Sequence, residues 1–318
     1  MSELLFSNRQ FFFANKEMVQ EKLSLSTQDR ETYLATLRAS QRQDAREKDQ
    51  ARLLSIQYGP DFGYVEVQLG RTRCTCTVSA TLGAPRMGES GEEGSVQFSI
   101  EISPMSAPGL ESNRISEDEV SLARTLEKTL KRSRAIDTEG LCVQPGARVW
   151  TVRCDLRVLD DDGNLTDAVV LAALAGLLHF RRPVAEVIDD EVKVWTAEEK
   201  NPVPLTIYHA PFAVTFAFFH GGAVQVIDPT LLEESLAAGS LTVACNVHRE
   251  MVAIAMSGGA PLAADQIIWC AHLAAEQVAV WTGAVRAAML EDYTARGIKL
   301  HASNIFDKLE GEGGVIMD

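Results

Sequence analysis

Basic side chains crowd one short stretch of the sequence and are its most evident chemical feature. Between residues 128 and 134 the chain carries four cations, namely Lys128, Lys131, Arg132 and Arg134. Such groups pair with phosphate oxygens, so the cluster can bind an anionic partner such as RNA. The same pattern is typical of the solvated face of a surface helix, and the residues by themselves favour that simpler interpretation.

An acidic run offers a second candidate site. Asp160, Asp161 and Asp162 stand directly before Gly163 and Asn164, and carboxylates are ligands that calcium prefers. A calcium loop also needs ligands at spaced positions and a closing glutamate, and this run lacks both. We therefore predict a polar turn that caps the following helix, and no metal site.

The six histidines and six cysteines form no recognisable catalytic or metal-binding pattern. The sequence contains neither an HExxH nor a CxxC motif. Cys270 and His272 lie two residues apart on a predicted helix, so they point to different faces and form no catalytic pair. We predict reduced, mostly buried cysteines, a reducing compartment, and a protein without metal or cofactor.

The composition narrows the class of protein. The chain has 318 residues, of which 46% are hydrophobic, enough for a large buried core in one large domain or two compact halves. Its net charge of −14 argues against a free-standing nucleic-acid-binding protein. The first 25 residues carry charges throughout, and no apolar run is long enough to span a bilayer. We therefore expect an intracellular, soluble protein without a membrane partner.

The first half of the chain is predicted to form strands and two helices, and these must position the basic cluster and the acidic run. Period-two alternation of apolar residues predicts strands at 65–69, 74–78, 96–102 and 148–159. Ser116 and Glu119 form a capping box, and the helix after it is predicted to bury Val120, Ala123, Leu126 and Leu130. The Ala/Leu/Val-rich stretch at 167–178 predicts a buried helix.

The second half repeats the order of strands, helix, strands and helix. Strand-like runs occupy 203–219, 223–227, 241–247 and 251–256. Asp228 and Pro229 predict the N-cap and first residue of a short helix that stops at Gly239. A long helix is expected from about Leu262 to Tyr293. The residues alone thus predict a protein that mixes helices and strands in two similar halves.

Several segments of the chain match the sequence pattern of one known family. The first is Arg42-x-Asp44-x-Arg46, and the others are 63–73, 103–108, 131–142, 146–150, 159–167, 179–183, 202–205, 226–230 with Glu233 and Glu234, and 246–250. Together these segments resemble RNase PH-like subunits of the eukaryotic RNA exosome, and the first is similar to the RxDGR motif of that family, with Ala45 in place of glycine. The resemblance covers roughly residues 40–290, and the whole set of motifs makes it specific.

This resemblance implies an α+β, RNase PH-like fold with pseudo-duplicated βαβα halves, of the kind called ribosomal protein S5 domain 2-like. We accordingly divide the chain into an N-terminal arm at 1–40, a first half at 41–190, a second half at 191–300 and a flexible acidic tail at 301–318. The implied partners are other RNase PH-like subunits in a six-membered ring, S1/KH cap subunits, an associated processive exoribonuclease and single-stranded RNA. The implied role is support of 3′-to-5′ RNA processing and degradation, including rRNA maturation and mRNA turnover, in the nucleus, nucleolus and cytoplasm.

The resemblance also implies that this subunit is not an enzyme. Active relatives hold phosphate with a Gly-Ser/Thr-Arg step, and the matching residues here are Asn164, Leu165 and Thr166, without the arginine. Asp167 is expected to add negative charge where phosphate would bind. The catalytic aspartate of active relatives precedes a Val-Pro step, where this chain has Pro202. Since phosphoryl transfer depends on positioning and charge stabilisation, either loss is severe. The alternatives are an active phosphorolytic exoribonuclease and a free-standing RNA-binding protein.

Three arginines are candidates for lining an RNA channel: Arg71, Arg73 and Arg114. Arg71 and Arg73 lie between two early strands, and Arg114 lies in the loop before the capped helix, where active-type members of the family carry an arginine pair. Guanidinium groups pair with phosphate oxygens whatever the base sequence. The alternative is that Arg114 is a solvated loop residue and that Arg71 and Arg73 pair with nearby carboxylates.

Overall fold

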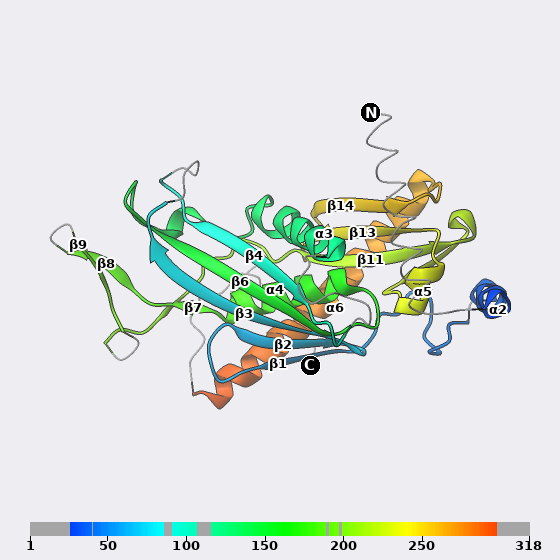
Figure 1. Cartoon of the computed structure of the whole chain (residues 1–318), viewed down its shortest axis with the longest axis horizontal. Coiled ribbons are helices and arrows are strands. Elements are labelled where there is room, and N and C mark those ends of the chain that lie inside the picture. Colours follow the sequence, from blue (N-terminus) through cyan, green and yellow to red (C-terminus); the bar gives the residue numbers. More distant parts are fainter. Residues whose placement is uncertain are drawn as a thin grey trace, which may run out of the picture.

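Two β-sheets lie on either side of one buried helix, α4, which spans Leu165–His179 (Figure 1). The structure is a computed structural model and describes residues 26–39, 41–85, 91–106, 116–188, 191–196 and 199–297. Helix α4 contacts β2, β3 and β6 of the first sheet and β11 of the second. The fold therefore mixes helices and strands, as the sequence predicts.

The first sheet has the strand order β1-β2-β3-β6-β4. These strands span Leu54–Tyr58, Tyr64–Leu69, Thr72–Gly83, Arg148–Asp160 and Ser95–Ile102. Neighbouring strands are antiparallel except for β4, which runs parallel to β6. The short β5, Cys142–Gln144, adds to β6 after the 3-10 turn η2 at Glu139–Leu141. Helix α3, Glu117–Leu126, and its π-helical continuation η1, Glu127–Lys131, pack beside α4 and against β4.

The second sheet is antiparallel, with the order β12-β11-β13-β14. Its strands span Val224–Ile227, Phe212–Phe219, Gly239–Cys245 and Met251–Gly258, with the 3-10 turn η3 at His220–Gly222. The long helix α6, Ala264–Ala295, packs on β11 and β13 and also contacts β1 of the first sheet. Two further helices, α2 at Thr27–Arg38 and α5 at Leu231–Leu236, cover the other side of this half and share a small apolar cluster with Phe219.

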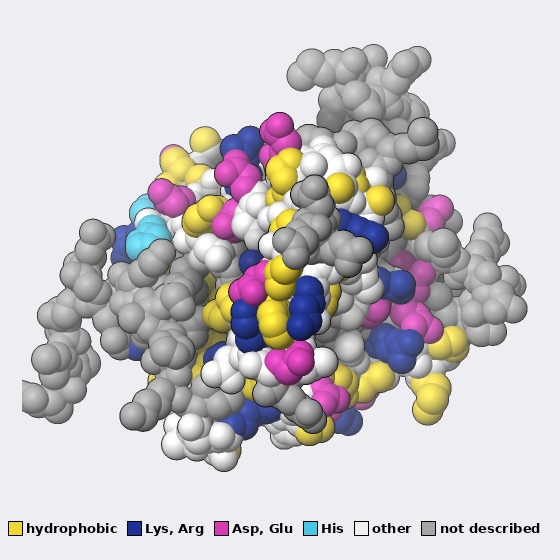
Figure 2. All heavy atoms as spheres, turned by 90° about the vertical axis from the view of Figure 1, so that its left-hand side faces the viewer, with side chains coloured by type: hydrophobic (Ala, Val, Ile, Leu, Met, Phe, Trp, Pro, Cys, Tyr) yellow, Lys and Arg dark blue, Asp and Glu magenta, His cyan; other side chains and the backbone are white. Residues whose placement is uncertain are grey.

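A hairpin projects from the junction between the two halves. It is formed by β8, Ala185–Ile188, and β9, Glu191–Val194, and it extends away from both sheets in Figure 1. Figure 2 views the molecule from this end, where hydrophobic side chains lie between basic and acidic ones. At the base of the hairpin, β7 at Arg181–Arg182 pairs with β10 at Val203–Pro204. This pairing places β10 beside β7, directly after the carboxyl end of α4.

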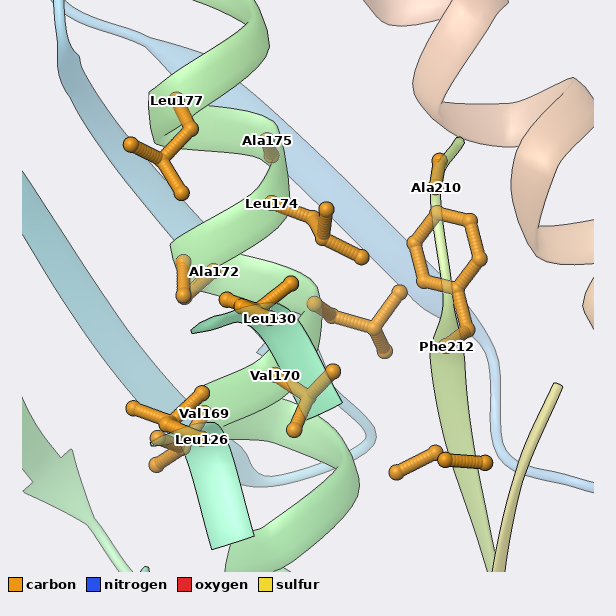
Figure 3. Close-up of a cluster of buried hydrophobic side chains, with 14 of the residues drawn as sticks. Leu126, Leu130, Val169, Val170, Ala172, Leu174, Ala175, Leu177, Ala210 and Phe212 are labelled. Carbon is orange, nitrogen blue, oxygen red and sulfur yellow. The ribbon is translucent and has the colours of Figure 1, made fainter. Parts of the chain in front are cut away.

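The core is built around α4, because its sequence is apolar on every side. Thirteen of its residues, Asp167 to His179, are buried. Figure 3 shows Leu126 and Leu130 packing against α4 from one direction and Phe212 of β11 from another. A helix that is apolar all round belongs inside a protein, which is the physical reason for its central position. The predicted buried helix at 167–178 is thus confirmed.

Most of the predicted elements are present. The alternating residues of β2 and β6 point inward as predicted, with Val65, Val67, Cys154 and Leu156 buried. The long helix predicted from Leu262 to Tyr293 spans Ala264–Ala295. The capping box at Ser116 forms, with the side chain of Glu119 accepting from the backbone N–H of Ser116. In the described part of the chain, no helix is long and apolar enough to cross a membrane.

Three predictions about local structure were wrong. Val120 is 41% exposed, because α3 turns Leu122, Leu126 and Leu130 inward at four-residue spacing. The run at 203–219 is strand only at 203–204 and 212–219.

The third error concerns the helix expected to begin at Asp228. Helix α5 begins at Leu231, with Thr230 as its N-cap and Glu233 completing a capping box, so Pro229 does not open it. The helix ends at Leu236, and Gly239 starts β13 instead of stopping the helix. Asp228 has a left-handed backbone, with φ of 49°, and its carboxylate is turned into the protein.

Candidate functional site

The amino-terminal end of α4 is the place where the sequence predicts a lost phosphate site. Asn164 precedes the helix in a left-handed conformation, with φ of 54°, and is buried. Its side-chain amide does not cap the helix; Nδ2 donates to Asp167 Oδ2 at 2.7 Å and to Asp228 Oδ1 at 2.6 Å. The predicted polar turn is present, because the backbone N–H of Gly163 donates to Asp161 Oδ1 at 3.0 Å. Asn164, however, ties the turn to the second half of the chain.

Glycine at position 163 lets the second half approach this turn closely. Gly163 has φ of +85°, and a side chain there would meet the backbone of Leu231 at the start of α5. The backbone N–H of Leu231 donates to the carbonyl oxygen of Asp162 at 3.0 Å. The starts of α4 and α5 are therefore held together, which brings the acidic residues of α5 to the start of α4.

A carboxyl group of the protein itself fills the position at the start of α4 where an anion would bind. The backbone N–H of Asn164 donates to Glu234 Oε1 at 2.8 Å. Helix N-termini attract anions because their N–H groups lack partners inside the helix and their dipole is positive there. Burial raises the pKa of Glu234 to about 8, although the hydrogen bond from Asn164 opposes this. The position that would accept phosphate is therefore occupied by Glu234.

Arginines from the first half form ion pairs with acidic residues of the second half. Arg52 donates to both oxygens of Asp228, with Nη2–Oδ1 at 2.8 Å and Nε–Oδ2 at 2.9 Å. Arg42 makes a two-bond contact with Glu233, at 2.6 and 3.0 Å. Arg46 Nη1 reaches Asp228 Oδ2 at 3.2 Å. We call Arg42, Arg46, Arg52, Asp228 and Glu233 the arginine clamp.

Four of the five clamp residues are buried, and their charges are matched. These are the cations Arg42 and Arg52 and the carboxylates Asp228 and Glu233. Burial alone would raise the pKa of Asp228, but its bonds to Arg52 and Asn164 hold that pKa below its ordinary value. Arg52 also donates to the carbonyl oxygens of Asp162 and Gly163, so it is held on both sides of the turn. These guanidinium groups are engaged inside the protein and are not presented to an external anion.

Asp167 faces the core, and the sequence-based picture of it was wrong. It was expected to place negative charge where phosphate would bind. Instead it is buried and accepts from the backbone N–H of Thr215 at 2.9 Å and from the Thr215 hydroxyl at 2.7 Å. Burial raises its pKa to about 7, against the effect of the hydrogen bonds from Asn164 and Thr215. The side chain that fills the anion position comes from Glu234, which belongs to the motif segments but was given no role at this site from the sequence.

Pro202 lies far from Asn164, Leu165 and Thr166. It immediately precedes β10, which pairs with β7 just after the carboxyl end of α4, whereas Asn164 to Thr166 start the same helix. A helix of 15 residues is about 22 Å long at 1.5 Å per residue. The structure therefore does not bring the two supposedly lost positions into one site, and the argument from Pro202 does not hold.

The candidate RNA-channel arginines have different surroundings. Arg73 pairs with Glu66 on the exposed face of the first sheet, as the alternative interpretation expected. Arg71 is exposed in the turn between β2 and β3, beside a hollow that Asp162 also lines. Arg114 lies outside the described residues. Of the two candidates that the structure describes, Arg71 is therefore better placed than Arg73 to contact RNA.

The basic cluster at Lys128, Lys131, Arg132 and Arg134 lies on the surface, and all four side chains are exposed. They follow α3 through η1 into the turn at Arg134, which has φ of 54°. Exposure of this kind agrees with a solvated face and with an anion-binding patch alike. Among the described residues, no three His, Cys, Asp or Glu side chains are grouped so that they could hold a metal ion.

Comparison with known proteins identifies the family. The sequence profile of the 3′ exoribonuclease family matches twice, its domain 1 at residues 28–183 and its domain 2 at residues 209–277. The exosome complex component RRP45 of Bos taurus is 41% identical over 272 residues, which are 86% of this chain and 62% of that protein. The rrp45 component of Schizosaccharomyces pombe is 36% identical, over 85% of this chain and 92% of its own length. The chain thus spans somewhat less than two thirds of the bovine relative's length.

A solved structure shows the same fold. A chain of the Archaeoglobus fulgidus exosome, determined with RNA bound to the active site, superimposes with a TM-score of 0.68 at 27% sequence identity. The match covers 80% of this chain and 94% of the archaeal one. The predicted α+β, RNase PH-like fold is confirmed.

Proposed function

This chain belongs to the RNase PH-type 3′ exoribonuclease family, and on that premise we propose that it is a non-catalytic ring subunit of the RNA exosome core. Its relatives named exosome complex component RRP45 match most of the chain, and the archaeal exosome chain matches its fold. In this role the chain supports 3′-to-5′ RNA processing and degradation, including rRNA maturation and mRNA turnover. Its partners are other RNase PH-like subunits in a six-membered ring.

The remaining parts of the proposal concern the wider assembly. S1/KH cap subunits sit on the ring, single-stranded RNA passes through it, and an associated processive exoribonuclease performs the cleavage. Arg71, with Arg73 and Arg114, contributes to the RNA path. The assembly works in the nucleus, nucleolus and cytoplasm.

The proposal that this subunit is non-catalytic rests on the occupied position at the start of α4. Phosphorolysis requires a bound inorganic phosphate that attacks the RNA linkage, so a subunit without an open phosphate site cannot perform it. Here Glu234 accepts the N–H of Asn164 at the helix start, and Thr166 stands where active relatives have an arginine. Arg42 and Arg52 are engaged with Glu233 and Asp228. These two guanidinium groups are therefore not presented to a phosphate ion.

We expect the purified chain to release no nucleoside diphosphates from single-stranded RNA above the no-enzyme control, with or without inorganic phosphate. An active RNase PH-family enzyme in the same assay is the positive control. The single substitution Thr166→Arg should stay inactive, because Glu234 still occupies the helix start. Phosphate-dependent diphosphate release by the unmodified chain would favour the alternative of an active exoribonuclease.

Complex formation tests the proposal that the chain is a ring subunit. We expect the chain to form a stable one-to-one complex with a co-expressed RNase PH-like exosome subunit, seen as a single peak in size-exclusion chromatography with light scattering. A chain that stays monomeric beside every ring subunit, yet binds RNA tightly with a steep salt dependence, would instead be the free-standing RNA-binding protein.

A further inference from the structure

Two hollows open on either side of one surface ridge, residues 50–53, where the arginine clamp leads into β1. The hollow on the α6 side has a volume of about 660 Å³ and the one on the side of the β2–β3 turn about 750 Å³. Gln50, Ala51, Arg52 and Leu53 line both. The ridge thus has a depression on each side, and a partner protein can contact it from both sides.

The ridge exposes apolar surface that nothing among the described residues covers. Leu53 is 91% exposed, and Val280 of α6, which lines the same hollow, is 64% exposed. Single exposed aliphatic residues are common on protein surfaces, but two that line one concave site are typical of a binding surface. The site thus favours an apolar side chain from a partner.

The charges around the ridge differ between the two hollows. On the α6 side, Glu47 and Asp49 are exposed, and no ion pair to either is found in the described part of the chain. On the other side Arg71 is likewise without an ion pair there; burial raises the pKa of nearby Asp162, and the charges of Arg52 and Arg71 oppose this rise. The cations deeper in this hollow, Arg46 and Arg52, are already paired with Asp228.

This distribution favours protein over RNA. An RNA backbone needs a track of unpaired cations, whereas the α6 side of the ridge carries two carboxylates without an ion pair, Glu47 and Asp49, beside exposed apolar side chains. A polypeptide can match both features, because it can carry an apolar residue next to a basic one. The surface is thus complementary to a protein segment with an apolar and a basic side chain.

We propose that residues 50–53 are a docking ridge for a segment of another protein subunit. That segment places an apolar side chain against Leu53 and Val280, and a basic side chain against Glu47 and Asp49. The inference rests on the proposed function for the existence of a neighbouring subunit, and it goes beyond that function by naming the surface and the chemistry of the contact.

The test compares Leu53→Asp with Met105→Asp in the co-expressed complex. Both residues are almost fully exposed, at 91% and 92%, and they lie beside β1 and β4, at opposite edges of the first sheet. The two substitutions therefore make the same charge change at equally exposed sites. We expect Leu53→Asp to weaken association of the subunits by about tenfold or more, as for a buried interface anchor, and Met105→Asp by less than about twofold. Unchanged melting temperatures of the isolated variants show that both still fold.

Val280→Asp gives an independent reading of the same surface, because Val280 lines the α6-side hollow together with Leu53. We expect it to weaken subunit association as Leu53→Asp does, and to leave the salt dependence of RNA binding by the assembled ring unchanged. Weaker RNA binding with unchanged association would assign the surface to RNA and overturn the docking proposal. Equal association of Leu53→Asp and Met105→Asp would also overturn it while leaving the proposed function intact. If the unmodified chain joins no ring subunit at all, the proposed function fails and the docking ridge fails with it.

Discussion

Replacing Arg52 by methionine is expected to lower the free energy of unfolding by about 3–5 kcal/mol. Arg52 is the main partner of Asp228, with two side-chain bonds at 2.8 and 2.9 Å. Methionine fills similar space but leaves the Asp228 carboxylate buried. Hydrogen bonds from Asn164 and from the backbone N–H of residue 52 remain, but the nearest cation is then Arg46, at the longer distance of 3.2 Å. A buried charge that loses its partner costs more than the pair contributed, because its hydration is not restored.

Urea denaturation at neutral pH measures this effect, and Arg153→Met is the matched control. Arg153 also pairs with an aspartate, Asp155 at 2.8 Å, but its side chain is 57% exposed. Exposed pairs contribute about 0–1 kcal/mol, so the control should change stability by no more than that. Equal losses in the two variants would show that the clamp is not the buried, desolvated contact described above.

Replacing Glu234 by glutamine is expected to stabilise the protein by roughly 3 kcal/mol at neutral pH, and by more at alkaline pH. The pKa of Glu234 is raised from 4.5 to about 8, so the folded chain keeps a proton that the unfolded chain has lost. Stability is therefore full below about pH 4.5 and is lost as the pH rises towards 8. Glutamine is neutral at every pH and can still accept the N–H of Asn164 through Oε1.

The neighbouring variant Glu233→Gln separates this effect from a general loss of charge. It removes the partner of the buried Arg42, so we expect it to destabilise the protein where Glu234→Gln stabilises it. Unfolding free energies measured from pH 5 to 8 should fall steeply for the unmodified chain and less for Glu234→Gln. Some slope remains, because the pKa of Asp167 is also raised, to about 7. A slope that is the same with and without Glu234 would contradict this account.

The sequence predicts best what depends on neighbouring residues. The alternation in β2 and β6 and the apolar run of α4 report burial directly, because side-chain periodicity follows backbone geometry. The boundary of α5 was misjudged because Asp228 and Pro229 look like a helix start, while the actual cap, Thr230 with Glu233, follows them immediately. Asp228 does not cap the helix, because its carboxylate is turned towards Arg52.

The candidate site could be predicted only in part. The motif at Asn164 to Thr166 marks the correct helix end, and the motif around Arg42 and Arg46 marks the clamp as important. Neither motif reveals that Glu234 lies against Asn164, because the two are 70 residues apart in sequence and meet only through packing of α5 on the turn at Gly163. One signal was available: charged residues such as Asp167 and Asp228 sit at the ends of strongly apolar segments, where burial demands a partner.

The sequence separation within the clamp has a consequence for folding on the ribosome. Arg42 and Glu233 are 191 residues apart, and Arg52 and Asp228 are 176 apart. While the chain is being synthesised, these arginines emerge long before their carboxylates, and burying them unpaired is too unfavourable to occur. The first sheet therefore cannot lock its first strand in place until α5 has left the ribosome. At ordinary translation rates of about 5–20 residues per second, that delay is on the order of ten seconds or more. For that interval the nascent chain displays an unfinished core, which is when chaperones or a partner subunit can reach surfaces that the finished fold closes.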